Sequence, residues 1–127
     1  MTTQNDSPSA DSVDAQLVDL QNSYIAKLDQ KLQDIIDLWI NFKNHDQSKE
    51  ELHPLYRAVH SVVGTSSTLN ISEVSRLCSS LEKVLLPMLK VDVLDANDIL
   101  AIGPQIAELS ALRESKDYKP KPIKLNG

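Results

Sequence analysis

The sequence predicts an all-α protein folded as an antiparallel up-down four-helix bundle. Three observations predict it: apolar residues recur at spacings of three and four, no segment alternates as a β-strand does, and glycine and aromatic residues are scarce. Four apolar-striped segments with short connections favour the up-down topology. The 127 residues are expected to form one domain at 12–115, between a mobile N-terminus at 1–11 and a flexible basic tail or linker at 116–127.

The first helical pattern runs from about residue 13 to about residue 43. Asp11 or Ser12 is a suitable N-cap. A segment of this length leaves room for a short extra N-terminal helix ahead of the main one. Its apolar face comprises Val13, Leu17, Leu20, Tyr24, Leu28, Leu32, Ile35, Trp39 and Phe42.

The second helix is expected to end near Asn70, and its start has two interpretations. Ser48 and Glu51 have the spacing of a capping box, whereas Pro54 favours a start near itself because proline is best tolerated in a first turn. The core positions repeat at four and three and are Leu55, Val59, Val62, Ser66 and Leu69.

The third and fourth helices complete the predicted bundle. The third begins near Ser72, and Pro87 predicts a kink or an early end. The fourth begins at Asp95, a good N-cap, and Gly103 with Pro104 can bend it. The third stripe is Val74, Leu77, Cys78, Leu81, Leu85 and Met88, and the fourth is Ile99, Ile102, Ile106, Leu109 and Leu112.

Composition narrows the possible functions and settings. A net charge of −5 argues against nucleic-acid binding. The single cysteine, Cys78, excludes an internal disulfide and favours a reducing compartment. No apolar run approaches a membrane span, and the N-terminus lacks a signal-peptide pattern, so a soluble cytoplasmic domain is expected. No histidine pair has metal-ligand spacing, and no helix shows a second stripe as strong as its first, so we expect no metal site and a monomer.

His60 falls outside the core face of the second helix. With Leu55 taken as zero, a helix places Val59 at about 40° and His60 at about 140°. Gly64 falls at about 180° and Ser67 at about 120° on the same count. Glycine is unfavourable inside helices, but one at this position uncovers the ring and lets another molecule approach. At neutral pH much of the imidazole has a free lone pair and can act as a nucleophile, so the site suits phosphoryl acceptance.

These residues resemble the histidine-containing phosphotransfer (HPt) domain. That family is a four-helix bundle with a phosphorylatable histidine on its second bundle helix. The resemblance covers roughly residues 17–112, and its specific part is the run from Leu55 to Glu82. The matching positions are Ala58, His60, Val62, Gly64, Ser66, Leu69, Leu77, Cys78, Leu81 and Glu82.

The resemblance implies a phosphocarrier without independent turnover. A phosphoryl group would pass between Nε2 of His60 and an aspartate of a response-regulator receiver domain. Mg²⁺ and an acidic pocket would be on the receiver, and a sensor hybrid histidine kinase would be a further partner, so no cofactor is expected here. The docking surface would include Tyr56, Val63 and Gly64, while Arg57, His53 and Ser67 are candidate contacts of the phosphoryl group.

Two positions depart from the family pattern and keep alternatives open. The family often has lysine three residues after the histidine, where this chain has Val63, and often glycine ten residues after it, where this chain has Asn70. Asn70 can still end a helix in a left-handed conformation. A binding module without phosphotransfer, a purely structural or oligomerising bundle, and the N-terminal phosphotransfer domain of a larger signalling kinase are the alternatives.

Overall fold

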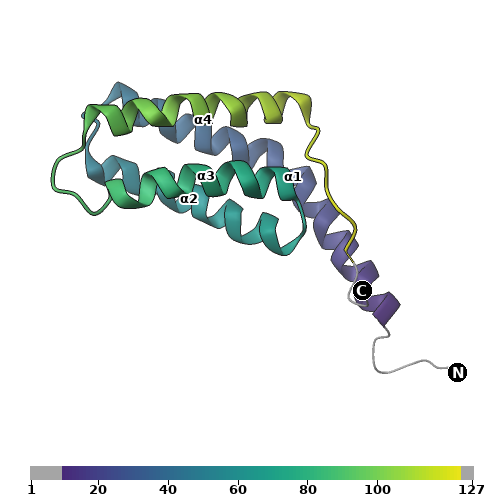
Figure 1. The fold of residues 1–127 in the computed structure, drawn as a ribbon. Helices are drawn as coiled ribbons and strands as arrows, with labels where there is room; N and C mark the ends of the chain where they lie inside the picture. Colours follow the sequence, from purple (N-terminus) through teal and green to yellow (C-terminus); the bar gives the residue numbers. More distant parts are fainter. Residues whose placement is uncertain (1–9, 124–127) are drawn as a thin grey trace, which may run out of the picture.

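The four predicted helices are present and form a closed ring of neighbours. A computed structural model describes residues 10–123, and side chains from residue 13 onwards. The helices are α1 (Ala10–Asn44), α2 (Lys49–Thr68), α3 (Ser72–Met88) and α4 (Ala96–Ser115). Each packs on the next in sequence, and α4 packs back on α1 (Figure 1). Over the described residues there is no strand, so the predicted all-α four-helix bundle is confirmed.

Helix α1 is longer than its partners and continuous. It has 35 residues against 20, 17 and 20 in the other three, so no separate lead-in helix precedes it within the described residues. Of the expected mobile segment 1–11, residues 1–9 lie outside the described part of the chain, while Ala10 and Asp11 are already helical.

The first turns of α1 project beyond the end of the bundle (Figure 1). Leu28 and Leu32 are fully buried, whereas Leu20, on the predicted core face, is 56% exposed. The expectation that the whole apolar stripe packs in the core is therefore wrong at this end. The physical reason is that Gln21, the next residue, takes the buried position at this level and donates to the Leu69 and Lys121 carbonyls, which leaves Leu20 on the exposed side.

Helix α2 begins directly after its capping residue, Ser48, and not at Pro54. The Ser48 hydroxyl accepts a hydrogen bond from the Glu51 amide at 3.3 Å, and the Glu51 carboxylate accepts one from the Asp46 amide at 3.1 Å. The helix therefore starts at Lys49, and the alternative start near Pro54 is wrong. A satisfied N-cap outweighs the proline, which lies inside the helix.

The corner between α2 and α3 is a Schellman motif. Asn70 has φ of 57°, the left-handed conformation expected for it. The Ile71 amide donates to the Ser66 carbonyl at 2.9 Å, and the Asn70 amide donates to the Ser67 carbonyl at 3.4 Å. Both bonds satisfy carbonyls that a helix end leaves open. The corner therefore fixes where α3 begins relative to α2.

The later helices follow the sequence closely. Helix α3 ends at Met88, one residue after Pro87. The Leu89 and Lys90 amides, which follow it, donate to carbonyls of its last turn. The Asp95 side chain accepts from the Asn97 amide at 2.7 Å, so the predicted cap is confirmed. Gly103 and Pro104 lie inside α4, which is helical from end to end.

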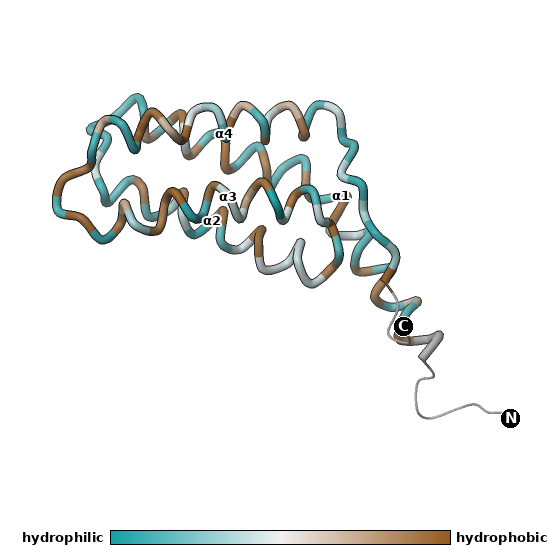
Figure 2. Tube along the Cα trace, viewed as in Figure 1, coloured by the Kyte–Doolittle hydropathy of each residue, from teal (hydrophilic) through white to brown (hydrophobic). Residues whose placement is uncertain are grey.

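The core contains nearly every predicted position of α2, α3 and α4. Ile99 is the exception, because it is only half-buried. The Ser66 hydroxyl donates to the Val62 carbonyl at 2.6 Å, which satisfies the buried hydroxyl as expected. Hydrophobic and hydrophilic stretches alternate along all four helices (Figure 2), and each helix contributes hydrophobic residues to the buried core. No helix in the described part of the chain has the length and apolarity needed to cross a bilayer.

The segment after α4 packs on the bundle instead of leaving it. Tyr118 is 4% exposed and Ile123 is 8% exposed. Lys116 and Lys119 have φ of 57° and 51°, which turn the chain back along α1. We call residues 116–123 the C-terminal strap. Residues 116–123 therefore do not form the expected flexible tail, because two apolar residues, Tyr118 and Ile123, anchor them to the bundle. The rest of that expected tail, residues 124–127, lies outside the described part of the chain.

Hydrogen bonds fasten the strap to the α2–α3 corner. The Lys121 amide donates to the Asn70 carbonyl at 2.9 Å, and the Asn70 side-chain amide donates to the Pro122 carbonyl at 3.2 Å. Gln21 of α1 is buried, and its side-chain amide donates to the carbonyls of Leu69 and Lys121, each at 2.8 Å. One glutamine thereby joins α1, the corner and the strap.

Candidate functional site

His60 lies on the solvent face of α2, as the angular position predicts. Its side chain is 65% exposed. The Tyr56 ring, one turn earlier, stacks on the imidazole with centroids 5.7 Å apart and planes 16° apart. Val59, its neighbour in sequence, is fully buried. The helix is therefore held from one side while the imidazole stays accessible from the other.

Glu82 of α3 pairs with the inner ring nitrogen of His60. Nδ1 of the imidazole and Oε2 of the carboxylate form a hydrogen bond. The glutamate side chain is 20% exposed, so it is more enclosed than the histidine that it holds. When the neutral imidazole donates its Nδ1 proton to this carboxylate, the ring lone pair is on Nε2.

The pairing of His60 with Glu82 follows from the helix register. The hydroxyls of Ser67 and Ser75 lie 2.6 Å apart across the same two helices. His60 lies seven residues before Ser67 on α2, and Glu82 lies seven residues after Ser75 on α3. Seven residues are close to two helical turns, so both pairs lie on the facing sides of the hairpin.

From the sequence, Glu82 was a position of the family motif and was not identified as a partner of His60, although a signal for that pairing existed. An antiparallel hairpin centred on Ile71, the residue after Asn70, brings residues 60 and 82 opposite one another. Applying the register of a short helical hairpin to the histidine would therefore have identified its partner.

Gly64 opens a hollow beside His60. A Cβ added to this glycine would meet nothing within 4 Å, so no contact inside the described chain requires glycine there. The hollow of about 450 Å³ lies between α1 and α2, and we call it the His60 hollow. It is lined by Leu20, His60, Ser61, Gly64, Thr65, Thr68 and Leu69.

A comparison with protein families identifies the family of the chain. The family model described as Hpt domain matches residues 15–115, which is most of the chain. The chain belongs to the Hpt domain family. Hpt domains act in histidine phosphotransfer in two-component signalling, as phosphocarriers that interact with receiver domains and kinases. No curated protein and no solved structure matches the chain.

The remaining residues predicted for the Hpt site are only partly gathered around His60. Tyr56 and Gly64 are next to it, and Val63 is half-buried with its side chain packed against the core. Ser67 is about 10 Å farther along the helix axis, and its hydroxyl is engaged with Ser75. The immediate surroundings of the imidazole are therefore aromatic, acidic and open.

Arg57 and His53 complete the predicted set, and both are exposed on α2. His53 precedes His60 by seven residues, which is about 10 Å along the axis. Arg57 is three residues before it and lies within reach of the same helix face. Of these two, only Arg57 is close enough along the helix to approach a group on the imidazole.

The buried titratable side chains near His60 have raised pKa values. Burial, with a smaller contribution from the Glu82 charge, raises the pKa of the Cys78 thiol to about 12. Burial and the neighbouring Cys78 raise the pKa of Tyr24 to about 12, although a hydrogen bond with Thr65 acts in the opposite direction. Among the described residues no group of three or more His, Cys, Asp or Glu side chains is placed to hold a metal ion.

Proposed function

We propose that this chain is a phosphorelay phosphocarrier whose acceptor atom is Nε2 of His60. The observation that carries the proposal is the exposed imidazole whose Nδ1 is occupied by Glu82, beside the gap left by Gly64. The first feature makes Nε2 the nucleophile, and the second gives a partner room to reach it. Family membership supports the same role.

The transfer step needs no proton movement on this chain. The Nε2 lone pair attacks the phosphorus of an aspartyl phosphate on a receiver domain, and an N–P bond forms. The P–O bond to the aspartate breaks, and its electron pair leaves with the aspartate carboxylate. Such in-line transfer depends mainly on positioning and charge neutralisation. The reverse step returns the phosphoryl group to an aspartate.

Glu82 has two tasks in this proposal. Before transfer its carboxylate holds the proton on Nδ1 and fixes the ring plane, with Tyr56 supporting the ring by stacking. After transfer the ring carries both the Nδ1 proton and the phosphoryl group, and the carboxylate balances its positive charge. Glu82 is therefore a positioning residue for the reaction.

The partner is a receiver domain, either free or within a sensor hybrid histidine kinase. We infer that it docks over the His60 hollow, where the exposed Leu20 supplies apolar area. By family likeness the receiver supplies Mg²⁺ and the acidic pocket, so this chain acts stoichiometrically and has no turnover of its own.

A binding module without chemistry is the second candidate, and Val63 is the observation that favours it. A valine cannot steady phosphoryl oxygens by charge as the lysine often found there can. In that case a receiver would bind without transferring its phosphoryl group. The chain could serve either role alone or as the N-terminal phosphotransfer domain of a larger signalling kinase.

Incubation with a phosphorylated receiver domain separates these candidates. We expect acid-labile, base-stable phosphate on the wild-type chain and none on His60→Gln, with the helical circular dichroism unchanged. His53→Gln and His45→Gln are matched controls, because both histidines are exposed and should leave labelling intact. Labelled His60→Gln protein would contradict the assignment, and receiver binding without any labelling of the wild type would favour the binding module.

A further inference from the structure

Lys27 of α1 is a cation without a partner among the described residues. Its side chain is exposed and makes no ion pair or hydrogen bond within that part of the chain. The positions three and four residues away on either side of it hold no Asp or Glu, so its own helix offers no carboxylate at the usual pairing distance. In a chain of net charge −5, an exposed and unpaired lysine is a local exception that needs an explanation.

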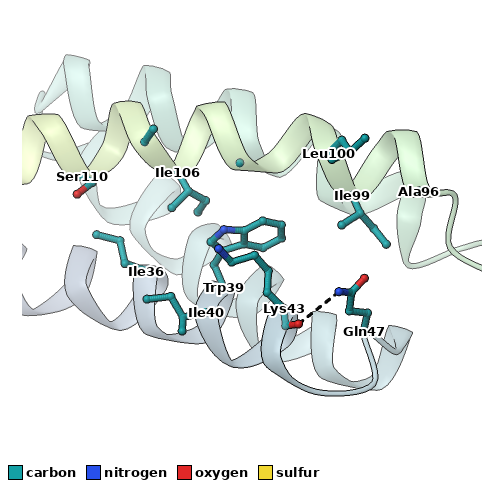
Figure 3. A pocket seen from close by; sticks show the side chains of 12 residues that line it. Ile36, Trp39, Ile40, Lys43, Gln47, Ala96, Ile99, Leu100, Ile106 and Ser110 are labelled. Carbon is teal, nitrogen blue, oxygen red and sulfur yellow. Dashed lines mark hydrogen bonds between the residues drawn. The ribbon is translucent and has the colours of Figure 1, made fainter.

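The other two lysines of α1 lie against aromatic rings of their own helix. The Lys31 ammonium is 5.7 Å from the Tyr24 ring centroid, and the Lys43 ammonium is 5.4 Å from the Trp39 ring centroid, beside the indole in Figure 3. Such cation–π contacts favour a position over the ring. Lys27 has no such contact within the described chain, so its charge is available to a partner.

The register between α1 and α2 places Lys27 close to the level of His60. The Tyr24 side chain is hydrogen-bonded to Thr65, and the two helices run antiparallel (Figure 1). Lys27 lies three residues after Tyr24, so it is level with about Val62, three residues before Thr65. His60 is two residues, or about 3 Å, farther along the axis.

Lys27 also lies on the face of α1 that borders the His60 hollow. Leu20 lines this hollow from the α1 side. Lys27 follows Leu20 by seven residues, which is about 20° around the helix and about 10 Å along its axis. The lysine therefore continues the α1 wall from Leu20 towards the level of the imidazole.

Arg57 of α2 is a second cation without a partner in the described part of the chain. It is exposed, and the positions three and four residues away on either side hold no Asp or Glu. It precedes His60 by three residues, which is about 4.5 Å along the axis. Lys27 is level with a position two residues after His60, so the two cations flank the imidazole from opposite directions.

The positive charge is confined to the His60 end of the α1–α2 face. Asp34 lies seven residues beyond Lys27 and, with Asp37, lines a separate hollow of about 620 Å³ between the same two helices. Both aspartates are exposed. A partner that carries a phosphoryl group brings negative charge, so it is attracted at the His60 end and repelled farther along the face.

We propose that Lys27 and Arg57 form a cationic rim that steers the phosphoryl-bearing, acidic face of a receiver domain onto His60. This inference rests on the proposed function, because it concerns the approach of the same partner to the same site. Charges at the rim of an interface act mainly on the association rate and its salt dependence. Neither cation takes part in the exchange of bonds, and the Nδ1 contact of His60 with Glu82 forms without them.

The association rate constant with a receiver domain tests the rim. The receiver is immobilised for surface plasmon resonance and loaded with Mg²⁺ and beryllofluoride, a stable mimic of aspartyl phosphate. Lys27→Glu and Arg57→Glu should each lower the association rate constant roughly fivefold at low salt. The loss should shrink at high salt, because screening removes the steering. Equal rate constants for the wild type and both variants, or a loss that persists at high salt, overturns the proposal.

Lys90→Glu is the matched control. It changes the net charge by the same amount, but Lys90 is an exposed residue of the turn after α3 and does not line the His60 hollow. Its association rate constant should equal that of the wild type, and a loss as large as in Lys27→Glu would show that net charge alone is responsible and would overturn the rim.

A small phosphodonor separates the rim from the proposed function. Phosphoramidate needs no protein docking, so it should label His60 equally in the wild type, Lys27→Glu and Arg57→Glu. An unlabelled wild type would contradict the phosphocarrier role. Equal labelling together with equal association rate constants in these three proteins would contradict the cationic rim alone.

Discussion

His60 and Glu82 lie opposite one another across the α2–α3 hairpin, and Nδ1 of the imidazole is hydrogen-bonded to Oε2 of the carboxylate. The two residues are 22 positions apart in sequence, and the corner between the helices brings them together. Because the glutamate occupies the inner nitrogen, it determines which nitrogen is available for chemistry. The reactivity of the histidine is therefore a property of the hairpin and not of α2 alone.

Removal of the Glu82 carboxylate should slow phosphotransfer without unfolding the chain. A hydrogen bond to a charged group contributes about 1.5–3 kcal/mol, so Glu82→Ala should reduce the transfer rate roughly tenfold to a hundredfold. Nitrogen chemical shifts of the His60 ring should show the proton redistributed between Nδ1 and Nε2. Glu73→Gln is the control, because Glu73 pairs with Arg76 on the same helix. An unchanged tautomer in Glu82→Ala would refute the positioning role.

Gly64→Ala should stabilise the protein while impairing its partner contact. Alanine is favoured over glycine in a helix by about 0.8–1 kcal/mol, and the added Cβ meets nothing within 4 Å. The free energy of unfolding should therefore rise. A methyl group at a closely packed contact costs about 1–3 kcal/mol, so transfer from a receiver should slow roughly tenfold.

The matched control for Gly64→Ala is Gly103→Ala. Gly103 is also inside a helix with open space at its Cβ, but it lies far from the His60 hollow, on α4. Both variants should gain similar stability in urea denaturation, and only Gly64→Ala should lose transfer rate. Equal transfer rates in the two variants would mean that the gap at Gly64 has no role in docking.

Stability should decline as the pH rises above about 9. The ordinary pKa values of 9.0 for Cys78 and 10.0 for Tyr24 are both raised to about 12 in the folded chain, chiefly by burial. The folded state therefore binds more protons than the unfolded state in this window, and stability present below pH 9 is lost as the pH approaches 12. Urea midpoints across this range measure the effect.

Cys78→Ala should flatten part of that pH dependence. The quantity to compare is the slope of the free energy of unfolding against pH. The absolute free energy also changes, because the substitution alters packing in the core. The wild-type thiol should in addition stay unreactive towards a thiol reagent in the folded protein and react when unfolded. A slope in Cys78→Ala equal to that of the wild type would show that the thiol does not titrate in this window.

The C-terminal strap offers a paired test at Tyr118. The ring is buried, and its hydroxyl has no hydrogen-bond partner among the described residues. Tyr118→Phe should therefore leave the melting temperature unchanged or raise it, because an unsatisfied polar group is removed. Tyr118→Ala should cost about 2–4 kcal/mol through the lost packing. Similar losses from both variants would mean that the hydroxyl has a partner.

The sequence was sufficient where the determinants are local. The caps at Ser48 and Asp95, the left-handed Asn70 and the buried stripes of α2 to α4 follow from spacing and cap chemistry. The exposed position of His60 beside Gly64 also follows from the angle per residue.

The features that the sequence did not reveal depend on distant segments. Glu82 is a partner only once the hairpin register is known, and Leu20 is exposed because Gln21 takes the buried position against the corner and the strap. The strap has the composition of a linker, yet Tyr118 and Ile123 anchor it to the bundle. Local propensity contains no information on any of these three features.

The strap is hydrogen-bonded to Asn70 at the α2–α3 corner, and the length of this corner determines which residue of α3 faces His60. One residue added to the corner would rotate α3 by about 100° relative to α2, and Glu82 would then face away from His60. The strap and Gln21 hold the corner at two carbonyls, those of Asn70 and Leu69, and Gln21 also donates to the Lys121 carbonyl of the strap. A deletion or graft at the C-terminus is therefore an intervention at the histidine, even though it touches no residue of the site.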